Sequence, residues 1–260
     1  RRDRSIAGDY QFHAVNAAVE ETGRARGMRA LGKGLREGQG TYWAGRMSGG
    51  QPGDRRAGVI WHTQGSGKSI LMVLIAKWLL EHDPDARILV VTDRDELDKQ
   101  IEGVMKNAGV IGAESPSPRI TSRAEFVEKL GSSTPRLLCA LIHKFDVADL
   151  QGERPPVSGR FYVFVDECHR TQGGDMNRQM KRWLESAIFV GFTGTPLLRK
   201  DKPMTRDVFG TYIHTYKFHE GVADGVILDL KYRLLYTSDA ADDLLCVDFA
   251  GRRIITKQIN

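Results

Sequence analysis

Residues 61–69 read Trp61-His62-Thr63-Gln64-Gly65-Ser66-Gly67-Lys68-Ser69, and they join an apolar strand segment to a helical pattern. This junction of strand, glycine-rich loop and helix is the strongest indication of the fold. Glycines in such a loop let backbone N–H groups close around phosphate groups at the start of the helix. We therefore expect the loop to bind ATP with Mg²⁺, Lys68 reaching the β- and γ-phosphates and Ser69 the metal. The other residues expected to bind nucleotide here are Thr63, Gln64, Gly65, Ser66 and Gly67.

One position departs from the full phosphate-loop pattern, which begins with a glycine where this chain has His62. A Gly-Ser-Gly turn between a strand and a helix can also arise without phosphate binding. The interpretation of the loop therefore depends on the motifs nearer the C-terminus.

A second motif comes after the strand pattern Phe161-Tyr162-Val163-Phe164-Val165. This run is continuously apolar, as is typical of a parallel strand covered on both faces, and it places Asp166 and Glu167 at its carboxyl end. Ligands of open α/β sheets bind at that edge. We expect Asp166 to hold Mg²⁺ and Glu167 to orient and deprotonate the water that attacks the γ-phosphate. The alternative is an acidic N-cap ahead of a solvated helix.

The segment Gly191-Phe192-Thr193-Gly194-Thr195-Pro196 is a third motif, at the end of another apolar strand pattern. Two hydroxyl groups flanking a glycine there can sense the γ-phosphate through Glu167 and His169. A plain turn would explain the glycine and the proline, but not the order of the three motifs. We therefore place His169 with the catalytic pair. The residues expected to couple the nucleotide state to a bound strand are Arg170, Thr193, Gly194 and Thr195.

The alternation of strand and helix patterns predicts an α/β fold with a doubly wound, mostly parallel sheet. Strands are predicted at 58–61, 87–91, 137–142, 161–165 and 187–193, and helices at 67–81, 96–107 and 175–184. Residues 111–121 are predicted as a loop followed by a short strand. Ahead of the sheet, residues 5–21 have apolar positions at helical spacing, which predicts a further helix.

Composition sets the outer limits. A chain of 260 residues with 41% hydrophobic content can bury one large α/β core. No apolar run approaches the roughly 20 residues that a bilayer span requires, so we expect a cytoplasmic protein with no membrane partner. Three scattered cysteines are too few for a disulfide framework or a zinc site. The net charge of +5 agrees with a polyanionic partner without establishing one.

Taken together, the three motifs resemble the first motor domain of superfamily 2 helicases and translocases. Longer segments around these motifs closely resemble the motor (R) subunit of type I restriction-modification enzymes, which also have a His at the position of His62. These segments include Val91-Thr92-Asp93-Arg94-Asp95-Glu96-Leu97-Asp98-Lys99-Gln100 and Asp166-Glu167-Cys168-His169-Arg170. The resemblance implies a RecA-like P-loop NTPase domain. It also implies that Gln11, within Tyr10-Gln11-Phe12-His13, contacts adenine.

The resemblance further implies an ATP-driven double-stranded DNA translocase that acts with methyltransferase and specificity subunits and cuts DNA. Thr92, Arg94 and Lys144 would then contact DNA phosphates rather than bases. A nuclease domain would precede this chain and a second motor domain would follow it, so we expect the chain alone to turn ATP over slowly. Two alternatives stay open: another superfamily 2 motor, such as a type III restriction or repair helicase, and a nucleotide-binding module without appreciable turnover.

Composition and the resemblance together divide the chain into parts. Residues 1–22 form the helical segment with the adenine-contact candidate, 23–56 a flexible loop rich in glycine and arginine, and 57–233 the motor domain. Residues 234–260 resemble the translation of a sequencing adapter, with a genuine β-hairpin as the alternative. In the acidic motif the family usually has Ala where this chain has Cys168, a small change that should leave the metal undisturbed.

Overall fold

The computed structural model describes residues 8–27, 53–93, 95–112, 115–145, 154–171, 175–196 and 205–228. Its centre is a six-stranded parallel sheet in the order β3-β2-β4-β5-β1-β6. The strands are β1 (Arg56–His62), β2 (Ala86–Thr92), β3 (Leu137–Leu141), β4 (Arg160–Val165), β5 (Ile188–Thr193) and β6 (Tyr212–Tyr216). This arrangement confirms the predicted α/β fold with a parallel sheet.

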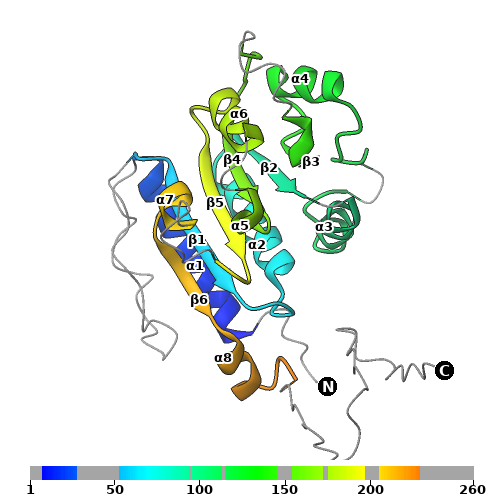
Figure 1. Cartoon of the computed structure of the whole chain (residues 1–260). Coiled ribbons are helices and arrows are strands. Elements are labelled where there is room, and N and C mark those ends of the chain that lie inside the picture. The colour runs from blue at the N-terminus through cyan, green and yellow to red at the C-terminus, as the bar shows by residue number, and fades with distance from the viewer. Residues whose placement is uncertain are drawn as a thin grey trace, which may run out of the picture. The chain divides into compact units, whose positions relative to one another are not determined.

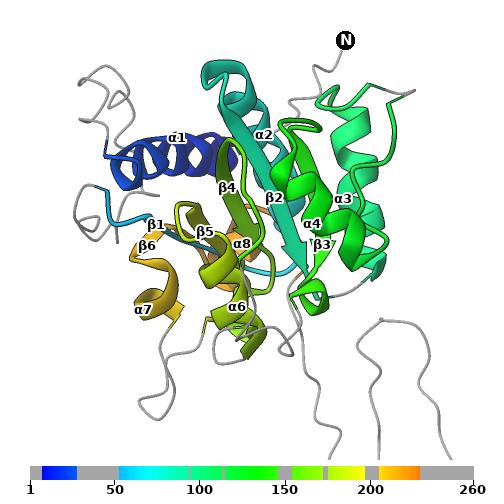
Figure 2. The same ribbon diagram turned by 90° about the horizontal axis from the view of Figure 1, so that it is seen from above.

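Helices cover both faces of the sheet (Figures 1 and 2). One face packs against α1 (Asp9–Ala25), α2 (Lys68–His82) and α3 (Asp95–Asn107), and the other against α4 (Arg123–Gly131), α6 (Asp175–Trp183) and α7 (Thr205–Phe209). Successive strand residues point to opposite faces, so in β2 Ile88 joins the first core and Leu89 the second. Shorter elements are η3 (Ile142–Lys144), α5 (Cys168–Thr171) and α8 (Phe218–Ala223). Within the described ranges, none of the helices combines the length and apolar character that crossing a membrane requires.

Some elements differ from the sequence prediction. Helix α1 begins at Asp9 and continues to Ala25, beyond the predicted end at residue 21. The short strand expected by residue 121 is a single parallel bridge between Arg119 and Cys139. Helix α4 and strand β6 are not among the predicted elements, and neither are the short helices η3, α5, α7 and α8. Of the flexible loop predicted at 23–56, residues 23–25 belong to α1 and residue 56 begins β1, whereas residues 28–52 lie outside the described residues. Residues 234–260 also lie outside them, and the prediction made for that segment stays a prediction.

Helix α4 and strand β6 both contain polar residues that interrupt the apolar pattern of the sequence. Helix α4 starts at a polar N-cap, where the Ser122 hydroxyl accepts from the Glu125 backbone N–H at 3.2 Å. Strand β6 is the short edge segment Tyr-Ile-His-Thr-Tyr, in which the polar His214 is nevertheless buried. Burial of that histidine depends on what β1 and α1 bring to it, which no local pattern indicates.

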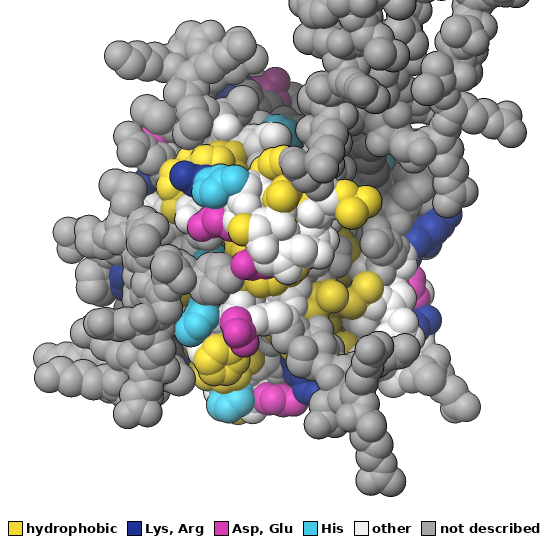
Figure 3. All heavy atoms as spheres, turned by 90° about the horizontal axis from the view of Figure 1, so that it is seen from below, with side chains coloured by type: hydrophobic (Ala, Val, Ile, Leu, Met, Phe, Trp, Pro, Cys, Tyr) yellow, Lys and Arg dark blue, Asp and Glu magenta, His cyan; other side chains and the backbone are white. Residues whose placement is uncertain are grey.

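The carboxyl ends of all six strands meet at one edge of the sheet, as parallel pairing requires. In Figure 1 this edge is the lower one, where β6 leads into α8. Seen from that side, histidine and acidic side chains lie among apolar ones (Figure 3). The phosphate-loop, acidic and Thr-Gly-Thr motifs come directly after β1, β4 and β5 and so converge there.

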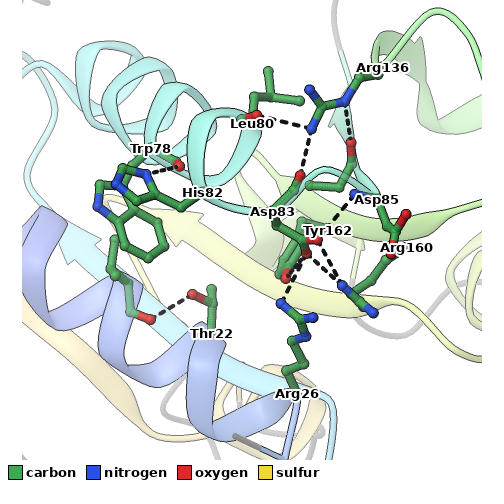
Figure 4. A network of polar contacts seen from close by, with 12 residues as sticks. Thr22, Arg26, Trp78, Leu80, His82, Asp83, Asp85, Arg136, Arg160 and Tyr162 are labelled. Carbon is green, nitrogen blue, oxygen red and sulfur yellow. Dashed lines mark hydrogen bonds and ion pairs between the residues drawn. The ribbon is translucent and has the colours of Figure 1, made fainter. Parts of the chain in front are cut away.

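At the opposite edge, Asp83 fastens the end of α2 to the sheet (Figure 4). Its carboxylate accepts from Arg160 at 2.7 and 2.9 Å, from the Tyr162 hydroxyl at 2.9 Å and from Arg26 at 3.2 Å. Burial would raise the pKa of Asp83, but the bonds from Arg160 and Tyr162 outweigh it and hold that pKa below its usual value. Arg136 donates to the Leu80 and Asp83 carbonyls and so satisfies the end of the helix. These contacts fix the C-terminal end of α2 to the sheet, while its N-terminal end adjoins the phosphate loop.

Candidate nucleotide-binding site

The phosphate loop connects the end of β1 to the start of α2. Gly65 and Gly67 have φ values of 84° and 80°, in the left-handed region that favours glycine. Ser66 closes the turn, since its hydroxyl donates to the Thr63 carbonyl at 2.6 Å. Helix α2 begins at Lys68, so the unpaired N–H groups of its first turn and the positive end of its dipole face the loop. The local geometry thus has the features of an anion site at a helix N-terminus.

Lys68 of the phosphate loop lies beside Gly194 of the third motif. The Lys68 ammonium donates to the His62 carbonyl at 3.3 Å, and a Cβ placed on Gly194 would lie 3.6 Å from the same ammonium. Trp61 holds the Thr-Gly-Thr segment in place, because its indole N–H donates to the Gly194 carbonyl at 3.1 Å. The first and third motifs are therefore in direct contact.

Helix α1 supplies the residues on the expected adenine side. The Tyr10 hydroxyl and the Gln11 amide N–H both donate to the Ser66 carbonyl, at 2.9 and 3.1 Å, while the Gln11 carbonyl oxygen accepts from the Gly8 N–H at 3.0 Å. An amide has two N–H groups and an oxygen with two lone pairs. Gln11 therefore retains one donor and one acceptor for a base edge, and its contact with adenine stays a prediction.

Asp166 and Glu167 follow β4 at the carboxyl edge. Burial raises the pKa of Asp166 to about 6; the Glu167 N–H opposes the rise by donating to Asp166 Oδ1 at 2.9 Å, while the Glu167 carboxylate adds to it. Glu167 has a φ of 42°, a conformation that costs a non-glycine residue about 1 kcal/mol or more and is typical of functional sites. The acidic pair is thus buried and held in a strained turn.

Mg²⁺ fits this arrangement, with Ser69 and Asp166 as its expected protein ligands. A divalent cation would offset the burial and the acidic neighbour that raise the pKa of Asp166. In the described part of the chain no group of three or more His, Cys, Asp or Glu side chains could hold a metal alone. Mg²⁺ is usually held by one or two carboxylates together with phosphate oxygens.

His169 joins the acidic motif to the third motif. Its Nδ1 lies 3.2 Å from Glu167 Oε2 and 2.9 Å from the Thr193 hydroxyl, and its Nε2 lies 3.4 Å from the Thr195 hydroxyl. The Thr195 backbone N–H also donates to the Thr193 hydroxyl at 3.0 Å. These contacts join the residues expected to couple the γ-phosphate to a bound strand, with the exception of Arg170, whose side chain lies outside the described ones.

The three candidate DNA contacts are placed less uniformly. Thr92 ends β2 and is 1% exposed, which disfavours a direct phosphate contact through its side chain. Lys144 lies in η3 and donates to the Thr121 carbonyl at 2.8 Å. Arg94 lies outside the described residues. DNA contact by these residues stays a prediction.

The sequence motifs did not identify two features of the site. His62 and His214 form a buried pair between β1 and β6, with 2.8 Å between Nε2 and Nδ1. Tyr216, also on β6, stacks on Tyr10 with 4.0 Å between ring centroids. The available signal was His62 itself, at a position where the general pattern has glycine; nothing near residue 214 marks its partner. Cys139 and Cys168 are buried free thiols, one in each of the two cores that flank the sheet.

Comparisons with known proteins agree with this geometry. A profile of the SWI2/SNF2 ATPase family matches residues 10–255. The type I restriction enzyme HindI endonuclease subunit of Haemophilus influenzae is 32% identical over 247 residues, covering 88% of this chain and 21% of that protein. The putative type I restriction enzyme MjaIXP endonuclease subunit of Methanocaldococcus jannaschii is 31% identical over 231 residues, covering 87% of this chain and 20% of that protein. The chain thus spans about a fifth of the length of these relatives.

Among solved structures, a nuclease-deletion mutant of the Type ISP restriction-modification enzyme LlaGI, in complex with a DNA substrate mimic, has a TM-score of 0.52 at 15% identity. The similarity covers 84% of this chain and 20% of that one, and at this identity it shows the fold alone. The chain therefore belongs to the SWI2/SNF2 ATPase family and, as its motifs predicted, groups with the endonuclease subunits of type I restriction enzymes.

Proposed function

We propose that this chain is the first motor domain of a type I restriction endonuclease subunit, which couples ATP hydrolysis to translocation of double-stranded DNA. The observation that carries the proposal is the contact between motifs: Lys68 lies beside Gly194, and His169 lies between Glu167 and Thr193. A phosphate-binding loop joined in this way to a catalytic carboxylate and a hydroxyl-bearing turn is what a nucleotide-driven motor requires.

Each residue has a physical role in the proposed reaction. The loop N–H groups and Lys68 stabilise the phosphate charge, and Ser69 with Asp166 would hold Mg²⁺, which supplies Lewis acidity at the phosphates when bound. Glu167 orients the attacking water and accepts its proton at a carboxylate oxygen. His169 holds that carboxylate at 3.2 Å while contacting Thr193, so a shift of Glu167 is transmitted to the third motif.

The activity of the whole protein is part of the proposal. We infer that the longer protein to which such a domain belongs translocates and cuts DNA together with methyltransferase and specificity subunits, in the cytoplasm. By itself the present chain should act mainly as a nucleotide-binding module, because related phosphoryl-transfer sites need an arginine finger worth about 10³ to 10⁵ in rate, which another domain supplies. Support comes from the kinship with type I restriction endonuclease subunits.

The first test is binding of ATP in the presence of Mg²⁺ by titration calorimetry. Lys68→Ala should weaken binding roughly 10- to 100-fold, the worth of a charge-assisted hydrogen bond. Lys77→Ala is the matched control, since Lys77 is an exposed lysine of the same helix. Equal affinities of the Lys68→Ala variant and the unmodified chain would refute the phosphate-binding role.

The second test measures turnover in a protein that contains both motor domains. Glu167→Gln should preserve ATP binding and reduce DNA-stimulated hydrolysis by about 10²-fold or more, because the general base is lost. Glu81→Gln, at an exposed position in α2, is the control. Normal hydrolysis by the Glu167→Gln variant would show that another group is the base.

A further inference from the structure

A buried pair of histidines joins the entrance of the phosphate loop to the edge strand of the sheet. His62 ends β1 and is 0% exposed; His214 lies on β6 and is 7% exposed. His62 Nε2 lies 2.8 Å from His214 Nδ1, with 5.0 Å between the ring centroids. The contact is a hydrogen bond between two imidazoles, one donating and the other accepting.

Both rings are neutral at physiological pH. Burial, then His214, then Lys68 hold the pKa of His62 well below its usual value. Burial, then His13, lowers the pKa of His214 to about 4. The other groups around the pair are Tyr10 and Tyr216, whose rings contact His62, and Asp224, which accepts from the Tyr216 hydroxyl. Across the described ranges, the second nitrogen of each imidazole meets neither a carboxylate nor any other hydrogen-bonding group.

Stability alone does not account for the pair. Two neutral rings carry two N–H groups, and only one of these can lie in the shared hydrogen bond. The remaining nitrogens, His62 Nδ1 and His214 Nε2, are buried without a hydrogen-bond partner among the described residues, so in either tautomer one N–H stays unsatisfied. Such a group opposes folding, and two apolar side chains of similar shape would fill the same space without it. Unsatisfied buried groups are rare in native proteins and call for an explanation.

The position of the pair supplies one. His62 is the residue whose backbone carbonyl accepts from Lys68. Its ring also packs against Tyr10 and Tyr216, with centroids 5.9 and 5.6 Å away. At the far end of the loop, the Ser66 carbonyl accepts from Tyr10, whose ring stacks on Tyr216 at an interplanar angle of 2°. Strand β6 therefore supports both ends of the phosphate loop, His214 acting at the start and Tyr216 at the end.

We propose that His214 is a positioning residue for the phosphate loop: its imidazole fixes the ring of His62, and with it the backbone carbonyl that orients Lys68. The inference rests on the proposed ATP-binding function and deepens it. It also accounts for His62 at a position where the general pattern has glycine. A glycine there would leave the loop entrance without a side chain to anchor it on β6.

The test uses variants that keep or remove one specific nitrogen. The Asn side-chain amide reaches about as far as His Nδ1, and that of Gln about as far as His Nε2. His214→Asn should therefore keep the contact with His62, whereas His214→Gln should lose it. In titrations with ATP and Mg²⁺, His214→Gln should weaken affinity roughly five- to tenfold, and His214→Asn less than about twofold.

The reciprocal pair on the other ring repeats the test independently. Because His62 uses Nε2, His62→Gln should retain affinity and His62→Asn should lose it. Combining His62→Asn with His214→Gln should cost no more affinity than either change alone, since both break the same contact. If urea denaturation shows that one variant does not fold, the Asn and Gln variants at the other histidine still test the contact.

The outcomes separate the two proposals. Equal affinities for Asn and Gln at both positions, with only stability altered, would overturn the positioning role while leaving ATP binding intact. If the unmodified chain bound no ATP, or if Lys68→Ala had no effect, the proposed function would fail and the positioning role with it. The positioning role is supported if His214→Gln and His62→Asn weaken ATP affinity while His214→Asn and His62→Gln retain it.

Discussion

Replacing Gly67 with alanine should destabilise the protein and displace the Gln11 amide of α1 from the phosphate loop. Gly67 has a φ of 80°, and a Cβ at this position would lie 2.6 Å from Gln11 Nε2. The left-handed backbone costs alanine about 1 kcal/mol. Displacing the Gln11 amide removes its 3.1 Å bond to the Ser66 carbonyl, worth about 1 kcal/mol more. We expect the free energy of unfolding to fall by about 2 kcal/mol.

Gly65 offers a matched control, because it has nearly the same backbone conformation, with a φ of 84°, but a Cβ there would meet nothing within 4 Å in the described part of the chain. Gly65→Ala should therefore cost only the backbone contribution of about 1 kcal/mol. The second control is Gly67→Ala in a Gln11→Ala background, where the side chain that would clash is absent. There the cost should also fall to about 1 kcal/mol.

Urea denaturation without nucleotide measures these differences, provided that the slope of the transition is unchanged. If Gly67→Ala costs no more than Gly65→Ala, or if its cost is the same with and without Gln11, the alanine side chain does not displace Gln11. Titration with ATP and Mg²⁺ on the same variants then shows how far the contact between α1 and the loop contributes to nucleotide affinity.

Three further predictions concern the core and the histidine pair. Gly191→Ala should lower the free energy of unfolding by about 1 to 3 kcal/mol in urea denaturation, because its Cβ would lie 2.9 Å from Cys168 Sγ. Adding Cys168→Ala to the same chain should restore part of this loss, and no recovery would contradict the clash. Arg87→Met should lower the free energy of unfolding by about 3 kcal/mol or more, because Arg87 is 2% exposed and its guanidinium donates to four backbone carbonyls. A loss below about 1 kcal/mol would show that these hydrogen bonds contribute little to stability. His214 should make the unfolding free energy rise with pH from about 4 to 6.5, by about 3 kcal/mol, since its folded pKa is about 4 and the unfolded chain binds the proton first. Asp166, whose folded pKa is raised to about 6, acts in the opposite direction over much of this range, so the His214 contribution is measured as a difference between variants. Denaturation at a series of pH values should show a smaller slope when His62 and His214 are both leucine, and an unchanged slope would disprove the assignment.

Much of the fold could be predicted because buried parallel strands leave a strong local signal. The continuous apolar runs of β2, β4 and β5 are covered on both faces, so every residue contributes to the pattern. Motif positions could be predicted too, since parallel strands bring their carboxyl ends to one edge. Helix α4 and strand β6 were missed because their polar residues interrupt the pattern. In β6 the interruption is His214, whose burial depends on a partner far away in sequence.

Local sequence therefore suffices to predict which strands carry chemical groups at their ends and what kind of group each motif supplies. Both properties depend on residues close together in the chain, because their spacing sets which side chains stand at the end of a strand. Which residues support the phosphate loop is known only from the folded chain. His62 and His214 are 152 positions apart, and Tyr10 and Ser66 are 56 apart. They meet because β6 adds to the sheet beside β1 and α1 packs across both, and such contacts arise from packing among distant segments that no local pattern encodes.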